Sequence, residues 1–408
     1  MYTVSKNTKI ISFALMAVGL IALIVGFSTD AHRAWPSLMI NNYFFLAIGA
    51  FAVFFVALQY VAEAGWAITV KRVAEAISSY FIVGGLVMIF IIVAGIMHWN
   101  HIWHWMAIGI MDPNSDIYDP IIHGKEAYLN PSFFLGRAIV YVLGWWYAAK
   151  KLKQLSMKED AEGGLKNYKK SITVSAIFIG FFGYTSSMMA WDWIMSIDTH
   201  WFSTLFGWFV FSSMGVTGFT MIAMLSIYLK RKGYLEYVNE NHIHDLGKWI
   251  FAFSILWTYM WFSQFMLIWY SNIPEEVTYY LARWDDYNFL FWATSAINFI
   301  FPLILLMSRD TKRNFSYIMA VGTIVLIGHW FNVFLMIAPG TLKDHWHIGF
   351  IEIGMFLGFL GLFLFVVHRA LTKMPLLPEN HPFVDEAKHL HILNILYALN
   401  KWKALQSW

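Results

Sequence analysis

Ten apolar stretches, each roughly 18 to 28 residues long, follow one another along nearly all of this 408-residue chain. An α-helix rises about 1.5 Å per residue, so about 20 apolar residues cross the hydrocarbon core of a bilayer. Inside a bilayer a helix pairs all its backbone polar groups within its own segment, which favours helices for such stretches. The sequence therefore predicts an all-α integral membrane protein with ten transmembrane helices, near residues 10–27, 42–62, 76–98, 132–149, 171–191, 202–229, 247–270, 287–307, 315–338 and 347–368.

The composition agrees with this fold class, since 59% of the residues are hydrophobic and 13% are charged, whereas soluble domains carry about 25% charged residues. The chain contains no Cys, which excludes iron–sulfur ligation, thiolate metal sites and c-type haem attachment within it. Its net charge of +3 comes from basic residues beside the apolar stretches and gives no indication of nucleic-acid binding. Any redox centre would need His ligands here or would belong to a partner.

Basic residues divide unequally between the two sides that ten spans define. The side that holds both termini carries 23 of the 28 Lys and Arg, and the opposite side carries Arg33, Lys125, Arg137, Arg283 and Lys343. Because Lys and Arg accumulate on the cytoplasmic side of membrane proteins, both termini are predicted to be cytoplasmic.

The spans form one membrane domain, residues 1–375, followed by a cytoplasmic tail, residues 376–408. In the tail, apolar residues recur every three positions from Val384 to Leu405. This pattern predicts an amphipathic helix that lies on the membrane surface or against a partner.

Two isolated carboxylates distinguish the segment 191–207. Between residues 171 and 229 there is no Lys or Arg, and the only acids are Asp192 and Asp198, with His200 beside them. At or inside a bilayer, a carboxylate without a local cation costs on the order of several kcal/mol or takes up a proton. This segment is therefore the first place to look for chemistry.

Span lengths bring other ionisable residues toward this segment. The tenth span has 16 uncharged residues between Glu352 and Arg369, about 24 Å of helix against a hydrocarbon core of about 30 Å. Arg369 can extend its long side chain to the surface, so Glu352 is predicted to be buried in the outer half. Similar reasoning buries Arg137, and His329 also falls in the outer half of its span.

Two interpretations of this outer group remain open. In the first, Arg137 pairs with one acid and the other residues are interfacial. In the second, the side chains form a proton-conducting half-channel, because Asp, Glu and His relay protons through the interior of helix bundles. Toward the inner side the candidates are sparser and show no complete path: Glu63 at the end of the second span, Lys71 and Glu75 in the loop after it, Asn298 near a mid-span, and Gln264 in the seventh span.

Metal and haem sites are weakly indicated. His98, His101 and His104 recur every three residues, but haem held by two His in a membrane bundle usually needs ligands on facing helices, so an interfacial position is favoured. The segment 112–119 begins like a calcium loop and lacks its Gly and closing Glu. Glycines of the tenth span are predicted to be close-packing positions between helices, namely Gly354, Gly358 and Gly361.

Three segments together resemble a known family: YLNPSFFLGRAIVY at 128–141, WDWIMSIDTHWFSTLFG at 191–207 and QFMLIWYSNIPEE at 264–276. On ten spans with cytoplasmic termini, they are similar to the F subunit of bacterial alternative complex III, a quinol:electron-acceptor oxidoreductase. That subunit is one of the polysulfide-reductase-like (NrfD-like) membrane proteins. The resemblance extends to about residue 380, and it implies two four-helix bundles, spans two to five and six to nine, flanked by spans one and ten.

The resemblance also implies an assembly in the bacterial inner (cytoplasmic) membrane. The expected partners are a homologous C-type membrane subunit, an iron–sulfur B subunit, haem-c subunits on the outer side and an aa3-type oxidase. Haem c and iron–sulfur clusters are expected in those partners, with no cofactor in this chain. The better-supported quinol site of the family lies in the C subunit. What carries over to the matching motif is the expectation that Asp192, Asp198 and His200 belong to a proton path.

The sequence thus predicts a membrane subunit of a quinol-oxidising respiratory complex, without a redox cofactor or catalytic residues of its own, that conducts protons through an outer half-channel. Two alternatives stay open: a purely structural scaffold for outer redox subunits, and a quinone-binding subunit. A secondary transporter is less favoured, because the charges gather toward one face and not at the midplane. The candidate proton-path residues are Asp192, Asp198, His200, Glu352, His329, Arg137, Glu63 and Gln264.

Overall fold

The computed structural model describes residues 2–390, and in this range the chain is helical and has no β-strand. Short 3-10 helices, and one π-helix, carry the label η. The elements are α1 (Lys6–Thr29), α2 (Ala31–Val61), η1 (Gly65–Ala67), α3 (Ile68–Ile77), η2 (Ser78–Tyr80), α4 (Phe81–Ile96), η3 (His104–Met106), α5 (Pro120–His123), α6 (Pro131–Glu162), α7 (Lys166–Trp193), η4 (Met195–Ile197), α8 (Phe206–Arg231), α9 (Glu240–Ser271), α10 (Pro274–Asp285), α11 (Asn288–Ser295), η5 (Ala296–Ile300), α12 (Phe301–Leu305), α13 (Arg309–Arg313), α14 (Phe315–Leu342), α15 (Phe350–Leu371) and α16 (Val384–Lys388).

Nine helical segments of the described range are long and apolar enough to cross a bilayer, as in a multi-pass α-helical membrane protein. They are Lys6–Thr29, Ala31–Val61, Gly65–Ile96, Lys166–Ile197, Phe206–Arg231, Glu240–Ser271, Asn288–Leu305, Phe315–Leu342 and Phe350–Leu371. The predicted fourth span, 132–149, lies within α6, a 32-residue helix outside this set. Arg137 interrupts the apolar part of α6, and the second half of this helix is rich in charged residues.

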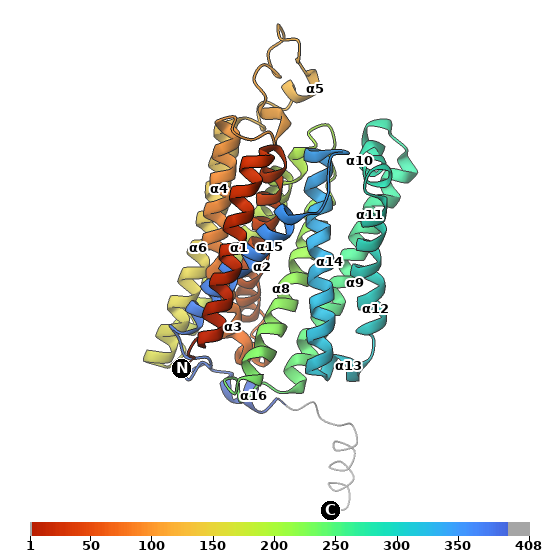
Figure 1. Ribbon diagram of the computed structural model, residues 1–408. Coiled ribbons are helices and arrows are strands. Elements are labelled where there is room, and N and C mark those ends of the chain that lie inside the picture. The colour runs from red at the N-terminus through yellow and green to blue at the C-terminus, as the bar shows by residue number, and fades with distance from the viewer. Residues whose placement is uncertain (1, 391–408) are drawn as a thin grey trace, which may run out of the picture.

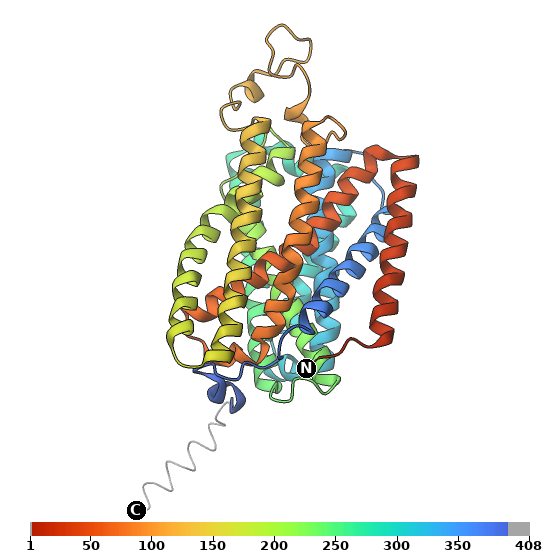
Figure 2. The ribbon, with the colours of Figure 1, turned by 90° about the vertical axis from the view of Figure 1, so that its left-hand side faces the viewer.

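The long helices run side by side and give the molecule two distinct ends (Figure 1). The start of α1 lies at the same end as α13 and α16, and we call this the terminal end. The other end, where α10 lies, is called the loop end. There the segment 97–130, which contains α5, projects beyond the helices in both views (Figures 1 and 2).

The helices pack in two groups and a pair. The first group is α2, α4, α6 and α7, in which α2 contacts the other three and α6 contacts α4 and α7. The second group is α8, α9, α14 and the helical segment α11–η5–α12. The remaining long helices, α1 and α15, pack on each other and against α2.

Glycines bring α1 and α15 into backbone contact. A Cβ atom on Gly358 would lie 2.5 Å from the Cα atom of Gly19, and one on Gly361 would lie 2.7 Å from the carbonyl oxygen of Ser12. No side chain fits at such distances, so the two helices approach as small-residue membrane helices do. The predicted close-packing role of Gly358 and Gly361 is confirmed.

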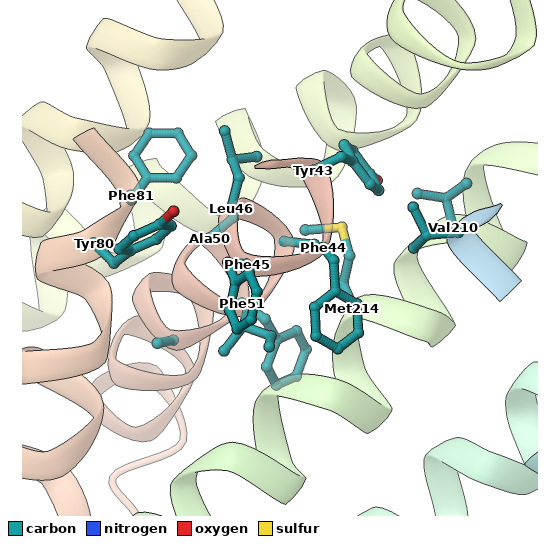
Figure 3. Close-up of a cluster of buried hydrophobic side chains, with 14 of the residues drawn as sticks. Tyr43, Phe44, Phe45, Leu46, Ala50, Phe51, Tyr80, Phe81, Val210 and Met214 are labelled. Carbon is teal, nitrogen blue, oxygen red and sulfur yellow. The ribbon is translucent and has the colours of Figure 1, made fainter. Parts of the chain in front are cut away.

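The interior centres on α2, whose side chains are mostly buried. Figure 3 shows its aromatic residues between η2 and α4 on one side and α8 on the other. Phe51 contacts Phe219 of α8 with ring centroids 5.0 Å apart, and Phe45 packs 6.4 Å from Tyr80 of η2. Because α2 joins both helix groups and the α1–α15 pair, it can bury side chains all around its circumference.

Two assignments made from the sequence were wrong. Helix α2 begins at Ala31, well before residue 42, because Asp30 caps it by accepting a hydrogen bond from the backbone N–H of Arg33 at 3.1 Å. The polar residues at its start bond within the protein, so they do not end the helix. Lys71 and Glu75, expected in a loop, are buried on α3, where they pair with charges of other residues.

The chain after α15 crosses the terminal end and contacts several helices. Backbone N–H of Glu379 donates to Asp160 of α6 at 3.0 Å, and the Ala387 carbonyl lies 3.0 Å from Nε2 of His242 of α9. Only the start of the predicted amphipathic helix falls here, and it forms α16. The rest of that prediction concerns residues 391–408, which lie outside the described residues.

Candidate functional site

The acid-rich segment begins at the end of α7, where Asp192 is bound by Arg137 of α6. Asn130 caps α6 and Pro131 occupies its first position, so the helix begins at a defined point before Arg137. The guanidinium donates two hydrogen bonds to the carboxylate, from Nε to Oδ2 at 2.8 Å and from Nη2 to Oδ1 at 2.9 Å. The hydroxyl of Tyr141 donates a third at 2.7 Å. Asp192 is therefore a buried but fully compensated anion.

Glu352 is bound by a different arginine. Arg33 of α2 donates from Nε to Oε1 at 2.7 Å and from Nη2 to Oε2 at 2.6 Å. Ser37 donates to Oε1 at 3.0 Å, and the backbone N–H of Gly349, at the start of α15, donates to Oε2 at 2.8 Å. The predicted burial of Glu352 is confirmed, since 1% of it is exposed. Its four donors make it a clamp between α2 and α15.

His200 faces the projecting segment 97–130 and not the helix interior. Its Nε2 atom lies 2.6 Å from Oδ2 of Asp119, and its side chain is exposed. Burial by itself would raise the pKa of the Asp119 carboxyl. Hydrogen bonds from the backbone N–H groups of Ile122 and Ile121, and the contact with His200, outweigh burial and hold that pKa below its ordinary value. This contact fastens the projecting segment to the loop end.

His329 is fully buried halfway along α14, in the second group. Its Nδ1 atom lies 2.9 Å from the hydroxyl oxygen of Ser213 on α8, which also accepts a hydrogen bond from Asn332 at 3.2 Å. Within residues 2–390, the Nε2 atom of His329 has no hydrogen-bond partner. A buried imidazole in this setting can exchange a proton between its two nitrogens if water reaches Nε2.

Asn332 also lines a cavity of about 30 Å³ toward the loop end. Gln264 of α9 lies in the same wall, donating from Nε2 to the Tyr280 hydroxyl at 3.3 Å and accepting from Ser203 at 3.4 Å. The hydroxyl of Thr294 is buried there without a partner in the described chain. This volume accommodates about one water molecule. We call the polar residues that connect the loop end to the centre of α14 the loop-end track: Gln264, Tyr280, Asn332, Ser213 and His329.

Arg283 of α10 also belongs to this region, and its position in the sequence did not indicate this. From the sequence it is one of the five basic residues on the side opposite the termini. It is 5% exposed and lines the same cavity. Its Nε donates to the Leu335 carbonyl at 3.1 Å and its Nη1 to the Tyr279 carbonyl at 2.7 Å, while the guanidinium carbon lies 3.3 Å from the centre of the Tyr279 ring. One feature could have indicated this burial: Tyr279 and Arg283 are four residues apart, so they share a helix face.

Asp198 lies on the other side of Arg283. It is half-buried and shares with Arg283 and Tyr279 the lining of a space of about 10 Å³. No carboxylate in the described residues comes within 4.0 Å of the Arg283 guanidinium. Asp198 is thus close to Arg283 without forming a direct ion pair with it.

The terminal end holds a second set of buried charges, which the sequence analysis did not connect. Arg72 of α3 donates to Glu75 at 2.8 Å and also binds Asp160 of α6. Lys71 donates to the Tyr60 hydroxyl, and that hydroxyl donates to Glu159 at 3.3 Å. We call Lys71, Arg72, Glu75, Glu159 and Asp160 the terminal-end cluster. The candidate Glu63 is not part of it, because Glu63 is exposed just after α2.

His381 covers the terminal-end cluster. Its Nε2 atom lies 3.7 Å from Oε1 of Glu159, and 4% of its surface is exposed. Burial, together with the positive charges of Lys71 and Arg72, lowers the pKa of His381 to about 3. The imidazole is therefore neutral at neutral pH, and the segment after α15 closes the cluster from water.

Aromatic side chains occupy the first group between its two charged regions. Trp145 of α6 packs 4.6 Å from the ring of Phe182 and 5.5 Å from that of Phe81. This layer separates Asp192 from the terminal-end cluster within the first group.

The eight candidates therefore occupy separate places. The second group contains Gln264 and His329, with Asp198 beside it, whereas Asp192 and Glu352 are each bound by an arginine. The six residues expected in one outer cluster do not form it, namely Asp192, Asp198, His200, Arg137, His329 and Glu352, and Gln264, expected toward the inner side, lies at the loop end. Span arithmetic does not give the direction in which a side chain points around the bundle.

The histidines before the projecting segment have exposed positions, namely His98, His101 and His104. Within the described residues, no group of three or more His, Cys, Asp or Glu side chains is placed to bind a metal ion. His101 lines a cavity of about 290 Å³ at the loop end together with His32 and Trp35. This cavity is the candidate space for the quinone-binding alternative.

Comparison with known proteins adds no relative: no family model matches the chain, and no curated protein matches it significantly. The resemblance in three segments therefore remains a hypothesis.

Proposed function

We propose that this chain is a membrane subunit of a quinol-oxidising respiratory complex, that it holds no redox cofactor, and that it conducts protons through the loop-end half of its second helix group. Membership of such a complex is supported by the three segments that resemble the F subunit of alternative complex III. The proton role is supported by one observation above all, the loop-end track with its cavity and the unpartnered Nε2 atom of His329.

In this proposal α6 is a tenth span, and both termini are cytoplasmic. Support comes from the 32-residue length of α6 and from its packing against α4 and α7. The excess of Lys and Arg on the side of the termini favours the same orientation. The loop end then faces the outside of the bacterial cytoplasmic membrane, and the first and second groups correspond to the two four-helix bundles that the resemblance implies.

The partners proposed are a homologous C-type membrane subunit, an iron–sulfur B subunit, haem-c subunits on the outer side and an aa3-type oxidase. Iron–sulfur clusters and haem c belong to those partners, because this chain has no Cys to bind them. Lipids cover the remaining apolar helix faces.

The residues of the track have complementary roles in proton transfer. His329 exchanges a proton between its nitrogens, and the Ser213 hydroxyl can both accept and donate. Asn332 and Gln264 cannot titrate, so they would hold the water that joins Ser213 to the loop end. Asp198, half-buried and lining the neighbouring space with Arg283, would accept the proton at that end.

A structural scaffold is the second candidate, and a specific observation favours it. Asp192 and Glu352, the acids first proposed for proton transfer, are each closed in a two-point salt bridge with an arginine. Paired in this way, they join α6 to α7 and α2 to α15, and neither acid is available to carry protons without breaking its pair.

Proton release per quinol oxidised distinguishes the two candidates, measured on the purified complex in proteoliposomes. Ser213→Ala removes the hydroxyl between Asn332 and His329, and His329→Gln removes the titratable ring. Both are expected to lower proton release severalfold while quinol oxidation persists. Ser212→Ala is the matched control, because that buried hydroxyl bonds only to the Phe209 carbonyl, at 2.7 Å. Release equal to wild type in both track variants would leave the scaffold role.

A further inference from the structure

The three buried arginines of the loop end differ in what balances their charge. Arg33 and Arg137 each donate two hydrogen bonds to one carboxylate. Arg283 is buried to a similar extent, 5% exposed against 7% and 6%, and donates only to two backbone carbonyls. A buried cation usually needs an anion in contact with it. The missing partner of Arg283 is therefore the feature that needs explanation.

The environment of Arg283 is rich in donors on one side. The cavity of about 30 Å³ that it lines is also lined by the carboxamides of Gln264 and Asn332, the Tyr280 hydroxyl and the Thr294 hydroxyl. The Thr294 hydroxyl is buried without a partner in the described chain. Charged residues are absent from the rest of this lining. One amide N–H of Gln264 and one of Asn332 are already bonded, to Tyr280 at 3.3 Å and to Ser213 at 3.2 Å. An unpaired guanidinium and the unpartnered Thr294 hydroxyl beside one space favour an anion.

We propose that this cavity binds a small monovalent anion of the halide class, with Arg283 as its counter-ion and Thr294 among its donors. A space of about 30 Å³, enough for about one water molecule, also accommodates a monatomic anion of the size of chloride. Asp198 lies on the opposite side of Arg283 and competes for the same positive charge. This competition limits the affinity.

The site is argued from Arg283 and its cavity alone, so it does not depend on proton transfer. A halide would occupy the space in which the proposed track holds its water, so the two occupants exclude each other there. Halide binding and proton release are separate measurements, so either proposal can fail without the other.

Bromide tests the site directly, because its anomalous X-ray scattering distinguishes it from water. Crystals of the wild-type protein grown in bromide are expected to show an anomalous peak in the cavity, within hydrogen-bond distance of Arg283. Density for water only, with no anomalous peak, would overturn the proposal.

Thermal unfolding in chloride, against gluconate at equal ionic strength, gives the second test. We expect a saturable rise of Tm with chloride that Arg283→Gln abolishes. Thr294→Val should raise the half-saturating chloride concentration severalfold, while Asp198→Asn should lower it. Thr323→Val, at an exposed hydroxyl on α14, is the matched control and should behave as wild type. An equal chloride response in wild type and Thr294→Val contradicts the site, even if Arg283→Gln does not fold.

Discussion

The pair formed by Arg137 and Asp192 allows a quantitative test of the structure. Arg137→Gln leaves the Asp192 carboxylate, 1% exposed, with the Tyr141 hydroxyl as its only remaining side-chain donor. Removing one partner of a buried ion pair costs about 3–5 kcal/mol, because the other charge stays uncompensated. Replacing both partners by apolar residues, as in Arg137→Met with Asp192→Leu, should cost about 1–2 kcal/mol at most, since no charge is left behind.

The measurement is the free energy of unfolding in mixed micelles titrated with SDS, followed by circular dichroism. A double-mutant cycle over Arg137→Met, Asp192→Leu and the double variant should give an interaction energy of about 3 kcal/mol or more. Arg283→Gln is the control, because its guanidinium donates to backbone carbonyls and the change breaks no direct ion pair, and it should cost about 1–2 kcal/mol. Additive effects in the cycle, or a loss below about 1 kcal/mol for Arg137→Gln, would refute the reasoning.

Three further outcomes are expected. Glu352→Gln should destabilise the protein by about 3–5 kcal/mol, because it leaves Arg33 buried without its counter-charge. Unfolding in SDS micelles measures this change, and an unfolding free energy equal to that of the wild type would contradict the role of Glu352 in joining α2 to α15. Gly358→Ala should cost about 1–3 kcal/mol in the same assay, since its Cβ would lie 2.5 Å from the Cα of Gly19, whereas Gly136→Ala, with nothing within 4 Å of its Cβ, should cost nothing. Because the pKa of His381 is lowered from 6.5 to about 3, the unfolded chain binds its proton first and stability falls as pH drops below 6.5; at pH 5 the loss is about 2 kcal/mol. Lower protection factors for the amides of residues 376–390 at pH 5 than at pH 7, with each exchange rate divided by the intrinsic rate at that pH, would report it, and His381→Gln should remove the difference.

The sequence predicted the secondary structure well where one physical rule decides it. Apolar length located the long helices, and the requirement for internal backbone pairing made them helices. It failed for the start of α2 and for Lys71 and Glu75 on α3, because charged residues usually mark loops and here they are paired inside the protein. The sequence shows that a residue is polar, but it does not show whether an ionic or hydrogen-bonding partner lies beside that residue in the folded protein.

The candidate site was predicted in part. Glu352 and His329 are buried as span lengths implied, and Arg137 contacts an acid. The partner of Glu352 was missed, because Arg33 is distant in sequence and lay outside every predicted span. Arg283 was missed for a related reason: its lack of a carboxylate partner is a property of the folded chain and not of its own segment.

By itself, then, the sequence determined that the chain is a multi-pass α-helical membrane protein, because apolar length and helix rise are properties of each local segment. The tertiary structure decided how the ionisable residues are paired. It joined Asp192 to Arg137 and Glu352 to Arg33. It also left Arg283 without a carboxylate in contact, and Nε2 of His329 without a hydrogen-bond partner, among the described residues. Pairing depends on the rotation of each helix about its axis, which packing between distant segments sets.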